Sequence, residues 1–230
     1  MSGTSISTAP PFPESQASVL EIAARAVGAP GIFELLNQVR DLVGHPAAVQ
    51  SAIKNWIEAK AQLTLAVDGS SGSDIHVGLN SSLSNLKATW DGVGSQAAQD
   101  YVGLIISSTN DTKKVVDQVI SQLVAVGDRV VRAYTDSIER INQFSDTILD
   151  YLGGSLAAVL NVNPGGAATT ITNELKGFSD ETTKILTTLI SDLQQYVDNI
   201  TNINSAAAGL NVPGPIAPSA LDYHLWHQRT

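Results

Sequence analysis

The sequence contains no cysteine, and this absence excludes several chemistries at once. A chain without thiols forms no disulfide, offers no thiolate nucleophile and binds no metal through cysteine. It is also indifferent to redox conditions, so cysteine usage leaves the cellular compartment open. Aromatic residues are scarce as well, at 5% of the 230 residues, which is little for the core of a sandwich or an α/β enzyme.

Basic residues are outnumbered, with 13 Lys and Arg against 22 Asp and Glu and a formal net charge of −9. Binding to nucleic acid requires an excess of Lys and Arg that displaces counterions from phosphate. Anionic membrane surfaces attract the same excess of basic residues. We therefore expect no nucleic-acid partner, and membrane contact only under the alternative function given below.

Long apolar runs are also missing. The longest mildly apolar stretch, residues 152–162, has 11 residues and includes two glycines, whereas a bilayer core is about 30 Å thick. The N-terminal sequence has no cationic segment followed by an apolar run, so no Sec-type signal peptide is expected. We expect a soluble protein that, if it is exported, leaves the cell without a cleaved signal peptide.

The apolar residues, 43% of the chain, recur at steps of three and four, which predicts amphipathic helices. Glycine and proline residues interrupt this pattern and mark the ends of the helices. No run of β-branched residues alternates as in a strand, and the one place where a short strand is considered is near 157–162. The predicted helices are 14–28, 31–44, 46–67, 75–90, about 95–152 and about 168–205. The fold class that we predict is all-α, an elongated antiparallel helical bundle built on a long helical hairpin.

The domain organisation follows from the same interruptions of the pattern. Residues 1–13 are rich in Ser, Thr and Pro and are predicted to be a disordered N-terminus. Residues 14–208 are predicted to form the helical bundle, with the hairpin at about 44–152 and the additional long helix at about 168–205. Residues 209–230 are predicted to be a proline-rich flexible tail.

Two details of the apolar pattern can be checked against a structure. Lys60 is the one charge in the apolar seam of 46–67. The seam of the last helix predicts that Leu175, Ile185, Leu189 and Ile200 are buried against the 95–152 helix.

The sequence Trp90-Asp91-Gly92 stands at a break between two amphipathic helices. Trp90 ends the apolar seam of the preceding helix, so we expect its indole to plug the end of the core. Gly92 is expected to supply a backbone conformation closed to other residues. As a triplet this motif carries little information, and its functional meaning depends on its surroundings.

Those surroundings resemble the WXG100 superfamily. The resemblance covers about 44–134 and is carried by the Gly-His-Pro-Ala-Ala-Val phrase that begins at Gly44, by Trp56 in the first helix, and by the Trp90-Asp91-Gly92 turn. In that family two long antiparallel helices meet at a Trp-x-Gly turn, and the proteins are substrates or partners of type VII secretion machinery. The resemblance implies a protein partner and makes Trp90, Gly92 and Trp56 the candidate binding residues.

The sequence departs from the family pattern in three ways. The first helix is interrupted at 68–74, where the family has a continuous helix. No tyrosine is followed by three residues and then Asp or Glu, the family's C-terminal export signal. The chain also continues well beyond a family hairpin and adds a further helix. Because this last helix could cover the hairpin face within the same chain, a monomer and a homodimer both remain open.

Three functions compete at this point. The first is a non-enzymatic WXG-like interaction protein, a substrate or partner of a type VII secretion system that is cytoplasmic before export and secreted or on the cell surface after it. The alternative is an α-helical pore-forming toxin whose membrane-inserting tip is 153–162. The third is a helical scaffold with no role in export, in which the helical hairpin is coincidental.

We find no sequence support for an enzyme, a cofactor or a metal site. General acid–base catalysis needs converging carboxylates or histidines, whereas the acidic residues are spread along helices at solvent-facing positions. His224 and His227 have a spacing that can share a metal on a helix, but no acidic cluster supports them. We expect this pair to be an exposed terminus.

Overall fold

The computed structural model describes residues 5–70, 77–153 and 167–229. These described residues are 82% helical with almost no strand, which confirms the all-α class. The chain divides into two compact units that we describe separately. Unit 1 comprises Met1–Gln50 and Val124–Val197, and unit 2 comprises Ser51–Leu123 and Asp198–Thr230.

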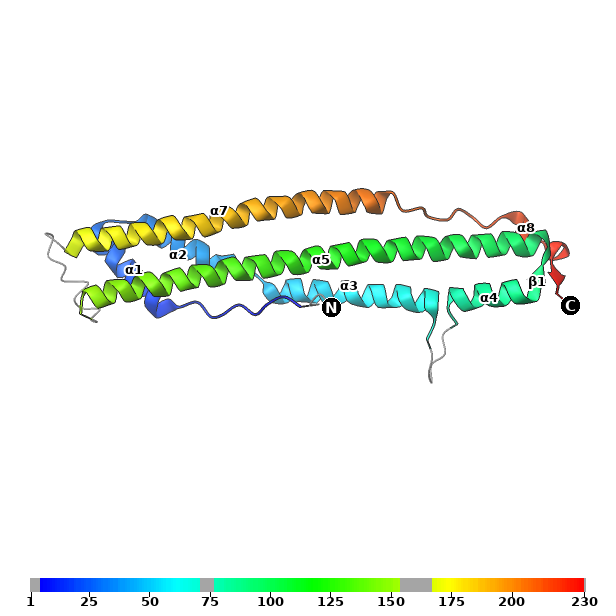
Figure 1. Cartoon of the computed structure of the whole chain (residues 1–230), viewed down its shortest axis with the longest axis horizontal. Helices are drawn as coiled ribbons and strands as arrows, with labels where there is room; N and C mark the ends of the chain where they lie inside the picture. The colour runs from blue at the N-terminus through cyan, green and yellow to red at the C-terminus, as the bar shows by residue number, and fades with distance from the viewer. Residues whose placement is uncertain (1–4, 71–76, 154–166, 230) are drawn as a thin grey trace. The chain divides into compact units, whose positions relative to one another are not determined.

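Each predicted helix is present, with ends within a few residues of the predicted ones (Figure 1). The main helices are α1 (Glu14–Val27), α2 (Gly31–Leu42), α3 (Pro46–Asp68), α4 (Leu79–Thr89), α5 (Gly92–Tyr151) and α7 (Ala167–Ala208). The last residues of the chain add α8 (Pro218–Leu221), a 3-10 turn (Tyr223–Leu225) and the two-residue strand β2 (His227–Gln228). A second two-residue strand, β1 (Trp90–Asp91), lies between α4 and α5.

The two strands are a finding that the sequence did not predict. A strand of two residues is too short to show alternation, so pattern analysis had no signal for it. The strand considered near 157–162 lies outside the described residues, as does nearly all of the 153–162 tip of the toxin hypothesis. No helix in the described ranges is both long and apolar enough to cross a membrane.

Unit 1 contains an apolar core built by four helices. Helices α1 and α2 fold back on one another because Gly28 adopts a left-handed φ of 72° and the next amide, of Ala29, bonds to the carbonyl of Ala24 at 2.8 Å. Their apolar faces join those of α5 and α7. The core residues are Ala17, Val19, Leu20, Ala23, Ala24, Ile32, Leu35, Leu36, Val39, Tyr134, Ile138, Ile141, Phe144, Ile148, Ile171, Leu175 and Phe178.

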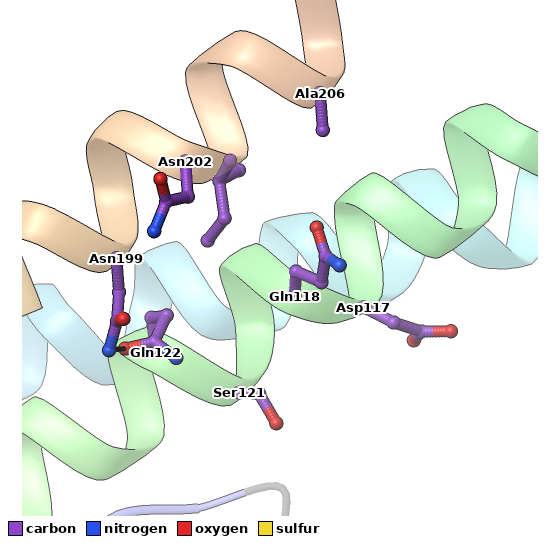
Figure 2. Close-up of a pocket in the computed structure, with 8 residues that line it drawn as sticks. Asp117, Gln118, Ser121, Gln122, Asn199, Asn202 and Ala206 are labelled. Carbon is purple, nitrogen blue, oxygen red and sulfur yellow. Dashed lines mark hydrogen bonds between the residues drawn. The ribbon is translucent and has the colours of Figure 1, made fainter.

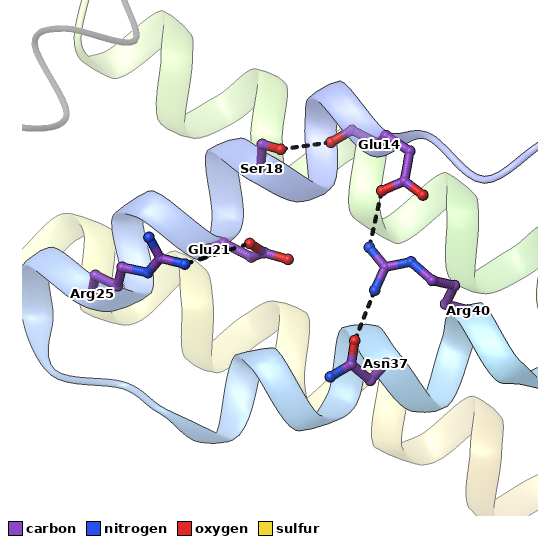
Figure 3. A network of polar contacts seen from close by, with 6 residues as sticks. All are labelled: Glu14, Ser18, Glu21, Arg25, Asn37 and Arg40. Atoms are coloured by element: carbon purple, nitrogen blue, oxygen red, sulfur yellow. Dashed lines mark hydrogen bonds and ion pairs between the residues drawn. The ribbon is translucent and has the colours of Figure 1, made fainter.

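A polar network joins the start of α1 to the end of α2 (Figure 3). The guanidinium of Arg40 donates to the Glu14 carboxylate at 2.9 Å and to the Asn37 side chain at 2.7 Å. The same guanidinium lies 4.5 Å from the centre of the Phe12 ring. Arg40 thus fixes the first residues of α1 against α2 while its charge stays partly solvated.

Two ion pairs between α5 and α7 give the relative direction of these helices within unit 1. Arg129 pairs with Asp192, and Arg140 pairs with Glu181 at 3.2 Å. Moving forward along α5 therefore means moving backward along α7, so the two helices are antiparallel here.

The predicted seam of α7 is confirmed in part. Leu175 and Leu189 are buried, at 2% and 3% exposed. Ile185 is only half-buried, and the prediction for Ile200 is wrong, because 47% of it is exposed.

Residues 6–13 of unit 1 form no helix or strand, and Ile6 and Ser7 contact α3 and α5. The Ile6 amide donates to the side chain of Gln50 at 3.1 Å. Both the amide and the hydroxyl of Ser7 donate to the Asp128 carboxylate, at 2.8 and 2.9 Å. The Ile6 side chain occupies the space above Gly127, where a Cβ atom would collide with it.

A contact within unit 2 accounts for Lys60, the charged residue that interrupts the predicted apolar seam of 46–67. Lys60 on α3 pairs with Asp117 on α5 at 2.6 Å, and Asp68 pairs with Lys113 at 3.9 Å. The two pairs show that α3 and α5 run antiparallel within this unit. Lys60 is therefore an interhelical contact and not a defect of the seam.

The apolar core of unit 2 is sparser than that of unit 1. Its buried apolar residues in the described ranges are Ile53, Val67, Ala98, Val116, Ile203 and Ala220. Helix α4 contributes no fully buried residue. The leucines of its seam, Leu79, Leu83 and Leu86, are half-buried.

Candidate functional site

The candidate site is the turn between α4 and α5, in unit 2. Helix α4 ends at Thr89, after which Trp90 is extended with φ −127° and ψ 145°. Gly92 then opens α5 with φ +91°, a conformation that residues with a Cβ rarely adopt. The expectation that Gly92 supplies a special backbone conformation is confirmed.

The first turns of α5 hold this turn in place through a short polar chain. The hydroxyl of Ser95 donates to the carbonyl of Trp90 at 3.1 Å, and the side chain of Gln99 donates to the Ser95 oxygen at 2.9 Å. Both Ser95 and Gln99 are buried. The backbone of Trp90 is thereby tied to the helix that follows it.

The expected position of the Trp90 side chain is wrong. Its indole does not plug a core, because 37% of it is exposed and α4 has no fully buried residue beside it. Its aromatic partner is Trp226, whose ring lies edge-on with a centroid distance of 5.9 Å.

The C-terminal residues return to this turn and pair with it (Figure 1, β1 and the red end of the chain). Strands β1 and β2 are antiparallel, with Trp90 opposite Gln228 and Asp91 opposite His227. The amide of Arg229 adds a hydrogen bond to the carbonyl of Thr89 at 2.9 Å. We call residues 218–229 the C-terminal segment.

The C-terminal segment is shaped by its own contacts as well. The indole Nε1 of Trp226 donates to the carbonyl of Ala220 at 3.2 Å, which curls the segment around the buried Ala220 side chain. The carboxylate of Asp222 accepts from the amide of His224 at 3.0 Å and starts the 3-10 turn. The segment thus presents Trp226 to the turn in a fixed orientation.

Two glycines of the turn make room for this segment. A Cβ on Gly92 would lie 2.6 Å from the carbonyl oxygen of Leu225. A Cβ on Gly94 would lie 2.6 Å from two atoms of the Trp226 indole and 2.9 Å from the carbonyl oxygen of Ser219. Atoms at these distances overlap, so any larger residue at either position displaces the segment.

An open apolar cavity of about 570 Å³ lies where the turn and the segment meet. Its walls are Trp90, Ala220, Leu221, Tyr223 and Trp226. Leu221 and Tyr223 are 71% and 75% exposed. Exposed aromatic and aliphatic side chains around one cavity form a surface suited to contact with another protein.

Trp56, the third candidate residue from the sequence, lies elsewhere in unit 2. It stands on α3 and is 40% exposed. The structure therefore brings Trp90 and Gly92 together with Trp226, and it places Trp56 on a separate helix face. Sequence analysis missed Trp226, and the available signal was the group of large apolar and aromatic residues Leu221, Tyr223, Leu225 and Trp226 near the end of the proline-rich tail.

The two C-terminal histidines make different contacts. The ring of His224 packs against Tyr223 at 3.8 Å, and His227 belongs to β2 beside Gly92. The described ranges contain no cluster of three His, Cys, Asp or Glu side chains able to hold a metal ion.

A second cavity in unit 2, of about 510 Å³, lies between α5 and α7 and is lined by side-chain amides (Figure 2). Gln118, Gln122, Asn199 and Asn202 face it, and the Asn199 amide donates to Gln122 at 3.3 Å. Asp117, at its edge, already pairs with Lys60. Ile203 and Ala206 add apolar side chains to its lining.

Comparisons of this chain with protein families, with curated proteins and with solved structures found no match.

Proposed function

We propose that the chain is a non-enzymatic interaction protein similar to the WXG100 superfamily, acting as a substrate or partner of a type VII secretion system. In this proposal 44–152 is the helical hairpin of an antiparallel bundle, and the helix 168–205 packs along it. The observation that carries the proposal is the helix break at which an exposed Trp90 is followed by Gly92 with a positive φ.

The partner in this proposal is a protein that contacts the Trp90 turn and the exposed helix faces. The apolar cavity beside Trp90 and the exposed indole of Trp56 support such contacts. The protein is cytoplasmic before export and secreted or on the cell surface afterwards, without cleavage of a signal peptide. It acts as a monomer or as a homodimer.

The test measures export and thermal stability together. Trp90→Phe keeps an aromatic ring at a partly exposed position, so we expect its melting temperature to stay near that of the wild type while export falls. Gly92→Ala is strained by its φ of +91°, so its melting temperature should fall too.

A host strain in which the secretion ATPase is inactive provides the control. Export that persists in this strain would refute the proposal. Export that follows melting temperature alone across both variants would reduce the Trp90 turn to a structural element.

A further inference from the structure

We propose that the Trp90 turn is a docking site for a short extended peptide bearing a tryptophan, and that its occupant is the chain's own C-terminal segment, bound reversibly. The turn surface is defined by the carbonyl of Thr89, the strand β1 and the space above Gly94. This inference does not depend on secretion.

The main-chain part of this recognition is the addition of a strand. Strand β2 pairs with β1, and the amide of Arg229 bonds to the carbonyl of Thr89. Hydrogen bonds between main chains give affinity to an extended peptide of any sequence. Selectivity therefore has to come from a side chain.

The selective side chain is Trp226, and Gly94 is the residue that admits it. Gly94 does not have a positive φ, so its backbone conformation is open to other residues. Its lack of a side chain matters because the Trp226 indole and the carbonyl of Ser219 occupy the place of a Cβ. The second glycine of the Trp-Asp-Gly-Val-Gly sequence is thus explained by the bound segment and not by the turn itself.

Few side chains of the segment are buried, and this makes its binding reversible. Of its side chains in 218–229, only that of Ala220 is fully buried, and Trp226 is half-buried. Residues 209–217 join the segment to α7, and none of them is helical. A segment with few buried contacts opens with a low free energy, and opening uncovers Trp90 and the space above Gly94.

The first test compares two glycine-to-alanine variants of the full chain on α5. Gly94→Ala fills the space of the Trp226 indole, whereas Gly103→Ala adds a methyl group where nothing lies within 4 Å. Hydrogen exchange of the Arg229 amide, measured by NMR, reports whether the segment is bound. We expect Gly94→Ala to raise this exchange rate about tenfold or more and Gly103→Ala to leave it unchanged.

Protection of the α5 amides beyond residue 103 serves as the folding check for both variants. Equal Arg229 exchange in the wild type and in Gly94→Ala would overturn the proposal. Loss of protection throughout α5 in Gly94→Ala would also count against it, because Gly94 would then support the fold and not a docked segment.

The second test supplies the segment in trans. A labelled synthetic peptide of residues 215–229 is titrated into the full-length Trp226→Ala chain, whose own segment lacks the indole, and binding is followed by fluorescence anisotropy. We expect saturable binding, at least about tenfold weaker binding to the wild-type chain because its own segment competes, and none to Trp226→Ala combined with Gly94→Ala.

A peptide that fails to bind Trp226→Ala, or that binds the double variant equally well, would refute the docking site. Neither experiment involves export, so failure here leaves the proposed secretion role untouched. A chain that binds the peptide but is not exported would contradict the secretion role and leave the docking site untouched.

Discussion

At the scale of single residues, Tyr134 is a titratable group whose surroundings change its pKa. It lies on α5 within the core of unit 1 and is 3% exposed. Burial raises the pKa of its phenol, and the nearby carboxylate of Glu14 raises it further. The folded chain therefore holds this proton more tightly than the unfolded chain does.

This shift predicts a loss of stability at alkaline pH. The contribution of Tyr134 is fully present below the ordinary tyrosine pKa of about 10 and is lost as pH rises through the higher folded-state pKa. Tyr134→Phe removes the titration, so its free energy of unfolding should fall less between pH 8 and pH 11. Urea denaturation at several pH values measures this, and parallel curves for the two chains would contradict the prediction.

Gly177 provides a second prediction at this scale. It lies on α7, where a Cβ would stand 2.9 Å from Cε1 of Phe144, a ring that packs edge-on against Phe178. Gly177→Ala improves helix propensity by about 1 kcal/mol but overpacks this aromatic pair at a cost of about 1–3 kcal/mol.

We expect Gly177→Ala to lower the free energy of unfolding, as measured in urea. Gly103→Ala is the matched control, because it gains the same propensity in open space and should stabilise the chain. Stabilisation of equal size in both variants would show that the Phe144 ring moves without cost.

At the scale of helices, α7 has positions that look alike in sequence and differ in burial. Leu189 and Ile200 belong to the same predicted seam, yet Leu189 is buried and Ile200 is 47% exposed. Leu189→Ala should cost about 2–5 kcal/mol as a core truncation. Ile200→Ala should cost less than about 1 kcal/mol, and similar losses from both would mean that another surface covers Ile200.

The ion pair between Lys60 and Asp117 tests the contact between α3 and α5. Both side chains are partly exposed, at 36% and 51%, so we expect a coupling free energy of about 0.5–1 kcal/mol in a double-mutant cycle with alanine. Lys54 and Glu58 form the control pair on α3 alone, with a distance of 3.9 Å and greater exposure. Their coupling should be smaller, and both couplings should decrease in high salt.

The sequence predicted the helices well because their ends depend on nearby residues. Gly28 ends α1 and Gly92 begins α5 through backbone conformations that glycine adopts readily. The position of the Trp90 side chain could not be predicted in this way. It depends on Trp226, which is distant in the sequence and lies in a segment with no periodicity.

At the scale of the whole chain, the two units differ in how much apolar surface each one buries. Unit 1 has the extended core around Leu36, Ile141 and Phe178, whereas the described part of unit 2 has a few separate buried residues. Stability rarely spreads evenly over such a chain. Helix α5 contributes residues to both units, so one helix should show both levels of protection.

We predict that amides at 134–148 of α5 exchange more slowly than those at 98–116. Native-state hydrogen exchange at increasing urea concentration measures this difference. Unit 2 should also unfold first on heating, giving a calorimetric enthalpy larger than the van't Hoff enthalpy. Uniform protection along α5, together with a single two-state transition, would contradict the prediction.

The contact of Ile6 with Gly127 bears on how the protein can change through evolution. Glycine within a helix is unfavourable by about 1 kcal/mol relative to alanine, and Gly127 tolerates no Cβ while Ile6 lies above it. Variation at these two positions should therefore be correlated among orthologues. In a lineage that shortens or replaces its first ten residues, no Ile6 side chain fills the space of a Cβ at position 127. Alanine should therefore accumulate at position 127 in those lineages alone.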